Sequence, residues 1–194
     1  MSLRFDAEKH QYFLTHDGVE RRVPGVTEVI RTFAPYWDCG QWYLDRGTAV
    51  HAAVALAVNN ALDWSTVDER IVGRVKSILR FIEDNQLSST AIEAKLISTR
   101  YRFAGTLDYL GYIEDRSCLI LCDWKGTIDR AAEVQVAAYT MLWNENAQDG
   151  FVTKAVLVEC QDAGDYRCEW LDFRALKRRQ SVFLNMLSVY NWRK

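Results

Sequence analysis

The chain has 194 residues, of which 49% are hydrophobic and 26% charged, and its formal net charge is −2. This length fits one domain with a sizeable core. The charge excludes a polycation, so affinity for nucleic acid would have to come from a local patch or a bound metal. No stretch reaches the roughly 18 apolar residues of a membrane span, and residues 1–13 lack the apolar core of a secretory signal.

Five cysteines occur without a close CxxC pair. An odd number at these spacings argues against a disulfide framework or a zinc site. The sequence therefore indicates a reduced, cytoplasmic setting.

The first part of the chain predicts a β-hairpin followed by helices. Residues 11–14 and 19–23 are expected as strands on either side of the turn THDG. The lead-in VPGVTEVI then runs toward Pro35, and a helical region is expected over residues 36–59.

Residues 65–85 have the clearest helical pattern in the chain. Apolar side chains recur there at helical spacing. Thr66 and Glu69 have the spacing of a capping box, so the helix is expected to begin there.

The middle of the chain changes from helical to strand periodicity. Strands are expected at residues 91–97, 101–113 and 118–125, with the segment EDRS as the hairpin turn between the second and the third. A helix, two strands and a closing helix follow at residues 131–146, 154–160, 166–173 and 174–190.

This order of elements predicts a single α/β (α+β) domain over residues 1–194, with helices packed on a central mixed sheet. Its parts would be an N-terminal hairpin and lead-in (1–35), a helical region (36–90), a sheet core that carries the candidate site (91–173) and a C-terminal helix (174–194).

The strand LILCDWKG ends with an acid and a base on one face. Because side chains alternate along a strand, Asp123 and Lys125 point the same way while Trp124 points to the opposite face. Their Cα atoms would lie roughly 6.6 Å apart, which lets both side chains reach one small polar site. Charged residues also commonly end a strand at solvent, so this pair alone does not indicate catalysis.

A second acid, Asp108, lies in the hydrophobic segment RFAGTLDYLGYI on the preceding strand. A buried carboxylate without a cation is costly, and Lys125 could serve as its partner. Two aspartates on neighbouring strands repel each other, however, and a divalent cation relieves that repulsion better than one ammonium group. Mg²⁺ prefers such oxygen ligands and completes its shell with water and phosphate. Gly105 would leave room for the backbone of a substrate.

Several motifs occur in a fixed order along the chain. RGTAVHAAV carries His51, and the motifs AGTLDYLGYI, LILCDWKG and QVAAYTML then carry Asp108, Asp123 with Lys125, and Gln135 with Tyr139. Together they resemble the PD-(D/E)XK nuclease superfamily and, within it, the RecB-like exonuclease branch. RVPGVTEVI is similar to the lead-in of phage and mitochondrial genome-maintenance members, and the resemblance covers about residues 23–143.

Two positions depart from the pattern of that branch. The motif D-x-K is often followed there by T-S, whereas this chain has G-T, and the histidine helix often carries a glutamate where this chain has Ala55. Some members hold an iron–sulfur cluster through one early and three late cysteines. Cys39, Cys160 and Cys168 are too few and wrongly spaced for that arrangement, so no cluster is expected.

The resemblance implies a restriction-endonuclease-like core with the order helix, three strands, helix and strand. It implies that Asp108 and Asp123 bind one or two Mg²⁺ or Mn²⁺ ions, with the carbonyl oxygen of Trp124 as a further ligand. Lys125 would orient or deprotonate the attacking water. His51 would bind a second or entry metal, although a lone histidine in an apolar helix is commonly a hydrogen-bonded core residue.

The remaining candidates surround this centre. Glu93, on the first strand, would contact the metal directly or through water, or would pair with Lys95 or Arg100. Gln135 and Tyr139 lie on one face of the predicted helix. The resemblance implies that they brace the catalytic lysine and contact the DNA backbone.

Further DNA contacts are expected from side chains near the active strands. Arg100 and Arg102 are the candidates for contacts to backbone phosphates. Trp37 and Trp42, just before the histidine helix, would stack on unpaired bases or belong to the core. The basic segment RALKRRQ, residues 174–180, is expected as a solvated helix face.

These features predict a Mg²⁺- or Mn²⁺-dependent deoxyribonuclease, more specifically an exonuclease that acts on single- or double-stranded DNA ends in recombination, repair or replication. A phage-encoded enzyme in the host cytoplasm fits the compact length, and a recombination or annealing protein is a candidate partner. Two alternatives stay open: a structure-specific or single-strand endonuclease, and a non-cleaving DNA-binding or assembly protein that keeps the fold. The sequence indicates neither strand polarity nor oligomeric state.

Overall fold

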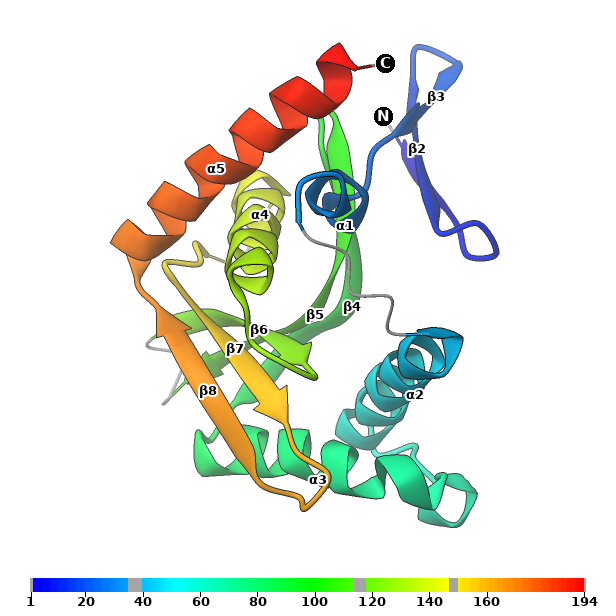
Figure 1. The fold of residues 1–194 in the computed structure, drawn as a ribbon, viewed down its shortest axis with the longest axis vertical. Helices are drawn as coiled ribbons and strands as arrows, with labels where there is room; N and C mark the ends of the chain where they lie inside the picture. The colour runs from blue at the N-terminus through cyan, green and yellow to red at the C-terminus, as the bar shows by residue number, and fades with distance from the viewer. Residues whose placement is uncertain (1, 35–39, 114–117, 147–149, 194) are drawn as a thin grey trace.

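A computed structural model of the chain describes residues 2–34, 40–113, 118–146 and 150–193 and shows two β-sheets with helices around them (Figure 1). None of the helices in these ranges is long and apolar enough to cross a membrane. In chain order the elements are β1 (Ser2–Asp6), β2 (Gln11–His16), β3 (Val19–Val23), α1 (Val26–Arg31), α2 (Gly40–Val58), a 3-10 turn (Trp64–Thr66), α3 (Glu69–Asp84), β4 (Ser88–Ser98), β5 (Phe103–Ile113), β6 (Cys118–Lys125), α4 (Arg130–Asn146), β7 (Lys154–Cys160), β8 (Tyr166–Leu171) and α5 (Phe173–Trp192).

The larger sheet is mixed and has the strand order β4-β5-β6-β7-β8. Strands β4, β5 and β6 form an antiparallel meander, β7 lies parallel to β6, and β8 runs antiparallel to β7 at the edge. A parallel pair needs a crossover connection, and α4 supplies it between β6 and β7. The predicted α/β class and the order helix, three strands, helix and strand are therefore confirmed.

Helices cover both faces of this sheet (Figure 1). One face packs against α1, α4 and α5, and the opposite face packs against α2 and α3. Leu121 of β6 belongs to the first cluster and Trp124 to the second, as alternation along the strand predicts. The end of β6 therefore lies between two hydrophobic layers, which removes its side chains from water.

The N-terminal sheet has the order β1-β2-β3 and packs beside the β4–β5 hairpin. Its strand β1, which pairs with β2, was not predicted from the sequence. Tyr12 packs with Ile97 and Ala104 in a third cluster, and its hydroxyl lies 2.9 Å from Oγ1 of Thr106. The predicted hairpin is thus part of a three-stranded sheet anchored on β5.

The start of α3 corrects the predicted capping box. Thr66 lies in the separate 3-10 turn, whereas α3 begins at Glu69 with Asp68 as its N-cap. The Asp68 side chain accepts the backbone N–H of Arg70 at 2.9 Å. Asp68 therefore caps this helix, a role that the sequence analysis gave to Thr66.

Some sequence predictions fall on residues outside the described ranges. They are the start of the helical region predicted over residues 36–59, at residues 36–39, which include Trp37 and Cys39, and the turn at residues 114–117. Within the described part, α2 begins at Gly40 and ends one residue before the predicted end.

Two glycines allow elements to approach closely. A Cβ on Gly73 of α3 would lie 1.7 Å from the carbonyl oxygen of Asp162, between β7 and β8. A Cβ on Gly105 of β5 would lie 2.7 Å from Cε1 of Tyr139. The predicted room for a substrate backbone at Gly105 is therefore wrong, because Tyr139 and Leu142 of α4 fill that space.

Replacement of Gly73 by alanine should lower the free energy of unfolding by about 3 kcal/mol, because the new methyl group would meet a backbone carbonyl that cannot rotate away. Urea denaturation measures this change. Gly47→Ala in α2 is the matched control, since an added Cβ there meets nothing within 4 Å, and it should raise stability by up to about 1 kcal/mol. Equal stability of the two variants would contradict the close approach of α3 to the β7–β8 turn.

Candidate active site

Asp108 lies in the middle of β5 and is 6% exposed. Its Oδ2 accepts the backbone N–H of Trp124 at 2.8 Å, which ties β5 to the end of β6. Its Oδ1 lies 3.4 Å from Nδ1 of His51 in α2. Burial opposes ionisation, but the charges of His51 and Lys125 keep the pKa of Asp108 below its ordinary value.

Asp123 is fully buried on β6, and its Oδ2 lies 2.6 Å from Nζ of Lys125. The acid and the base therefore share one face of the strand, as alternation predicts. Neither oxygen of Asp123 accepts a hydrogen bond of good geometry from the described residues, so the ion pair is its main compensation. Burial raises the pKa of Asp123 to about 7, with Lys125 opposing the rise and Asp108 adding to it.

Lys125 is held in its charged form by the same pair of aspartates. Burial by itself favours the neutral amine, but Asp123 and Asp108 together raise the pKa of Lys125 above its ordinary value. The ammonium group therefore persists at neutral pH and can donate to an oxygen or offset a negative charge.

His51 connects Asp108 to Glu93 of β4. Its Nδ1 lies 3.3 Å from Oε1 of Glu93, and one ligand atom from each of the three residues lies within 4.8 Å of the others. Burial favours the neutral ring, but Asp108 and Glu93 outweigh it and raise the pKa of His51 to about 10. Without a metal, an imidazolium ion thus balances two carboxylates.

Glu93 has a backbone conformation that is rare in a strand. Its φ angle is 49°, in the left-handed region. Ile92 and Ala94 would share the face opposite to Glu93 in a regular strand, yet Ile92 packs in the α2–α3 cluster and Ala94 against the α4 side. Such a conformation costs about 1–3 kcal/mol and persists where the surrounding structure imposes it, often at functional sites.

The donor set fits a divalent cation. Carboxylates are the ligands that Mg²⁺ prefers, and Mn²⁺ also accepts imidazole. The group within 4.8 Å consists of His51, Glu93 and Asp108, so the structure brings these three predicted ligands together. Asp123 lies outside that group but offers two oxygens without hydrogen bonds from the described residues. Its role as a ligand, and that of the Trp124 carbonyl, stay predictions.

Gln135 and Tyr139 of α4 are hydrogen-bonded to each other. Nε2 of Gln135 donates to the Tyr139 hydroxyl at 2.9 Å, and that hydroxyl also bonds Thr27 of α1. Burial raises the pKa of Tyr139 well above its ordinary value. Because Tyr139 is only 4% exposed, a packing role is favoured over direct contact with DNA. The predicted bracing of Lys125 stays a prediction.

Arg100 and Arg102, the candidates for contacts to backbone phosphates, precede the strand that carries Asp108. Both lie between β4 and β5, six or more residues before Asp108, which is roughly 20 Å along a strand. Glu145 of α4 accepts the backbone N–H groups of Thr99 and Arg100 at 2.8 and 3.1 Å. The predicted contacts of these arginines to backbone phosphates stay predictions.

Arg74 of α3 is a site residue that the sequence analysis missed. Its side chain is 14% exposed and is fixed by Oδ1 of Asp162 at 2.6 Å and by the carbonyl oxygen of Cys160 at 3.0 Å. It lines a pocket of about 100 Å³ together with His51 and Lys125. Helical periodicity marks Arg74 only as a polar position, and no spacing rule links α3 to the end of β6.

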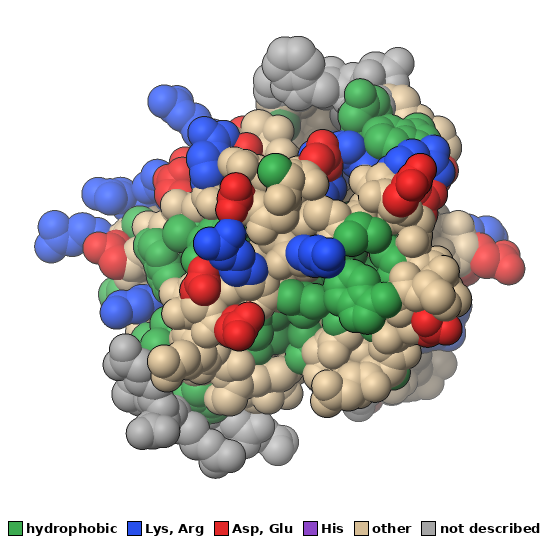
Figure 2. Space-filling view, turned by 90° about the horizontal axis from the view of Figure 1, so that it is seen from below, with side chains coloured by type: hydrophobic (Ala, Val, Ile, Leu, Met, Phe, Trp, Pro, Cys, Tyr) green, Lys and Arg blue, Asp and Glu red, His purple; other side chains and the backbone are tan. Residues whose placement is uncertain are grey.

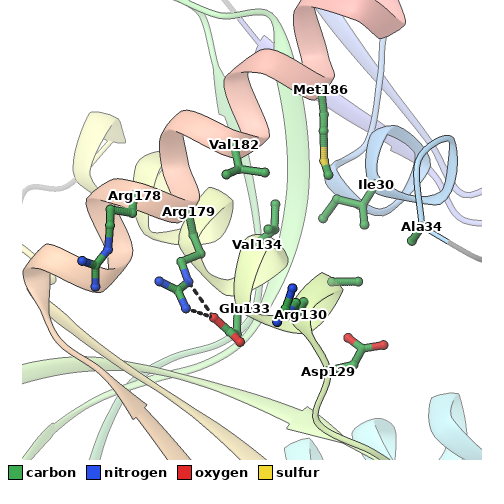
Figure 3. A pocket seen from close by; sticks show the side chains of 11 residues that line it. Ile30, Ala34, Asp129, Arg130, Glu133, Val134, Arg178, Arg179, Val182 and Met186 are labelled. Carbon is green, nitrogen blue, oxygen red and sulfur yellow. Dashed lines mark hydrogen bonds and ion pairs between the residues drawn. The ribbon is translucent and has the colours of Figure 1, made fainter.

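A larger cavity, of about 680 Å³, lies between α1, α4 and α5 (Figure 3). Its walls are mainly apolar, and Arg179 forms an ion pair there with Glu133. Arg178 and Arg179 belong to the basic segment 174–180, so part of that expected solvated face lines a cavity. The carboxylates and lysine described above do not line it, and its size alone does not make it the active site.

The face seen from below Figure 1, where α3 lies, carries lysine and arginine side chains interspersed with aspartate and glutamate (Figure 2). This mixture agrees with the net charge of −2. Any affinity for DNA on this face would therefore depend on individual groups rather than on a broad positive field.

No protein-family model and no curated protein matches the chain. Among solved structures it is similar to two structures of LHK-Exo, an alkaline exonuclease from Laribacter hongkongensis. The structure in complex with dAMP is 13% identical, with 87% of this chain and 89% of that chain covered and a TM-score of 0.40. The second is 15% identical, with 86% and 88% covered and a TM-score of 0.40. This likeness is too low to assign a function, which has to rest on the site itself.

The stability of the metal-free protein should fall as pH rises. Folding raises the pKa of Asp123 from 3.8 to about 7 and the pKa of His51 from 6.5 to about 10. Between these two pKa values of each group, the native state binds more protons than the unfolded state. The stability that these protons contribute is present at low pH. It is lost as the pH rises from 3.8 to about 7 for Asp123 and from 6.5 to about 10 for His51.

Excess Mn²⁺ should therefore raise the Tm more at about pH 8.5 than at about pH 6, because protons compete with the metal at the lower pH. Differential scanning fluorimetry measures both shifts. Asp108→Asn is the control and should lose the Mn²⁺ effect at both pH values. Equal Tm shifts for the native chain would contradict this account of the cluster.

Glu93→Gly should give a more stable protein than Glu93→Ala, by about 1 kcal/mol, because glycine adopts a positive φ angle without steric cost. In an ordinary strand the order is the reverse. Both variants remove the same carboxylate, so their difference in urea denaturation isolates the backbone. A less stable glycine variant would show that Glu93 does not have the left-handed conformation.

Proposed function

We propose that this protein is a divalent-metal-dependent deoxyribonuclease of the PD-(D/E)XK type and a member of its RecB-like exonuclease branch. The observation that carries the proposal is the fully buried Asp123, 2.6 Å from Lys125, at the end of β6. Asp108, on the adjacent strand, acts electrostatically on Asp123 and is itself one of three possible metal ligands, with His51 and Glu93. The order of the motifs along the chain supports the same assignment.

Each side chain has a separate task in phosphodiester hydrolysis. Asp108, Glu93 and His51 would hold a Mg²⁺ or Mn²⁺ ion, with Asp123 beside them. When bound, the cation polarises the phosphoryl oxygen and lowers the pKa of nearby water. Lys125, 2.6 Å from Asp123, would orient or deprotonate the attacking water and offset charge on the phosphate.

The finer parts of the proposal come from the motif resemblance. It supports an exonuclease that acts on DNA ends in recombination, repair or replication and leaves a 5′-phosphate. It also supports a phage-encoded enzyme and a recombination or annealing protein as its partner.

Asp123→Asn should reduce Mn²⁺-dependent digestion of end-labelled DNA by at least about a hundredfold, the usual scale for loss of one group that stabilises transition-state charge. The variant should still fold, since the neutral amide fills the same buried space. Gel analysis of a time course, with Mn²⁺ or with a chelator, measures the loss, and circular dichroism checks the fold.

Asp17→Asn is the matched control for this experiment. The substitution is the same, but the Asp17 side chain is 87% exposed. It lies in the β2–β3 turn, far from the cluster in sequence. This substitution should leave digestion unchanged. Full activity in Asp123→Asn would overturn the proposed function.

Linear and covalently closed circular DNA, digested side by side, separate an exonuclease from an endonuclease. The proposed exonuclease digests the linear DNA and spares the circle. Cleavage of both would support the structure-specific or single-strand endonuclease, in which case the cluster keeps its role but the exonuclease assignment fails.

A further inference from the structure

The first two turns of α2 present aromatic side chains to solvent. Trp42 is 43% exposed and Tyr43 is 54% exposed. Their ring centroids lie 5.0 Å apart at an interplanar angle of 83°, so the two rings meet edge to face and do not stack on each other. Arg70 also lies over Trp42, with its Cζ 5.9 Å from the ring centroid. Exposed aromatic rings can stack on any nucleic-acid base, because every base has a π-face.

Arg46 lies over both rings, with its Cζ 4.7 Å from the Trp42 centroid and 5.0 Å from the Tyr43 centroid. It forms no ion pair with a carboxylate in the part of the chain that the structure describes. A guanidinium held on an aromatic face keeps its charge and its planar donors, which suit a phosphate. The aromatic pair and its arginine thus form one surface with apolar and cationic parts.

This surface continues along α2 into the candidate active site. Tyr43, Gly47 and His51 are four residues apart and therefore lie on one face of the helix. Tyr43 and His51 are separated by about 12 Å along the axis. Gly47, between them, leaves that face open, since an added Cβ would meet nothing within 4 Å.

A pocket of about 100 Å³ occupies this opening. Its lining includes Tyr43, Arg46 and Gly47 of α2 together with His51, Arg74 and Lys125. Arg74 is fixed by its two partners on the β7–β8 side. The lining therefore combines a rigidly held cation, Arg74, with the proposed catalytic lysine.

We propose that this surface binds unpaired DNA, with bases stacked on Trp42 and Tyr43 and a backbone phosphate held by Arg46 and Arg74. The inference rests on the proposed function and names its substrate: a single strand, or a duplex end whose strands have separated. Bound in this way, the strand is led along the Gly47 face of α2 toward Lys125.

An ordinary exposed tryptophan does not share these features. Trp64 is 44% exposed, almost the same as Trp42, but among the described residues no arginine lies over its ring and it does not line this pocket. Trp64 is therefore a matched control for the loss of an exposed indole.

The test measures binding without catalysis. Fluorescence anisotropy with a labelled oligothymidylate of about 12 nucleotides, in the presence of a chelator, gives the Kd of each variant. Trp42→Ala and Tyr43→Ala should each raise the Kd about tenfold, the scale of one lost base stack. Trp42→Phe should restore most of the affinity, and Trp64→Ala should leave the Kd unchanged.

Arg46→Ala should also weaken binding, and its effect should shrink as salt rises, because a phosphate contact is electrostatic. A blunt duplex of equal length should bind more weakly than the single strand, and Trp42→Ala should change its affinity less. Circular dichroism of each variant checks that α2 remains folded.

The outcomes separate this inference from the proposed function, which is measured by digestion with Mn²⁺. If the native chain digests DNA but Trp42→Ala and Tyr43→Ala bind single strands as it does, the inference is overturned and the nuclease assignment stands. If the native chain binds single strands through Trp42 but digests nothing, the inference stands and the nuclease assignment is overturned. Equal effects of Trp42→Ala and Trp64→Ala also overturn the inference.

Discussion

A carboxylate with no exposure to solvent is the constraint around which this structure is arranged. Asp123 lies on β6 between two hydrophobic layers, where burial alone favours its neutral form. Lys125 offsets one negative charge, but Asp108 brings a second one from the next strand. An arrangement that keeps both acids needs additional positive charge, and a protonated His51 or a divalent cation supplies it.

The fold gathers these groups from elements that are far apart in the chain. α2 contributes His51, β4 contributes Glu93, β5 contributes Asp108, and β6 contributes both Asp123 and Lys125. The mixed sheet places β5 and β6 side by side, and α2 lies against the face that carries Trp124. At the left-handed backbone of Glu93 the alternation of β4 is interrupted, so Ile92 packs on the α2–α3 side and Ala94 on the α4 side. This conformation, which has a local energetic cost, brings the Glu93 carboxylate next to His51.

Features that depend on neighbouring residues could be predicted from the sequence. β6 runs from Cys118 to Lys125 as its alternation indicated, and the order of the predicted elements indicated the mixed sheet. Features that depend on tertiary contacts could not be predicted in the same way. The left-handed backbone of Glu93 has no local sequence cause. Arg74 is held at the site by Asp162 and Cys160, next to the close approach of Gly73 to Asp162. Gly105 looked like space for a substrate but is filled by a tyrosine from α4.

The most direct measurement is the anomalous difference map of a crystal soaked in Mn²⁺. The account predicts one strong peak among the carboxylates of Glu93, Asp108 and Asp123, with the His51 ring turned toward it. Lys125 should remain next to Asp123. A map without a peak there, in which the carboxylates of Asp108 and Asp123 face away from each other, would contradict the claim that this buried charge cluster is a metal centre.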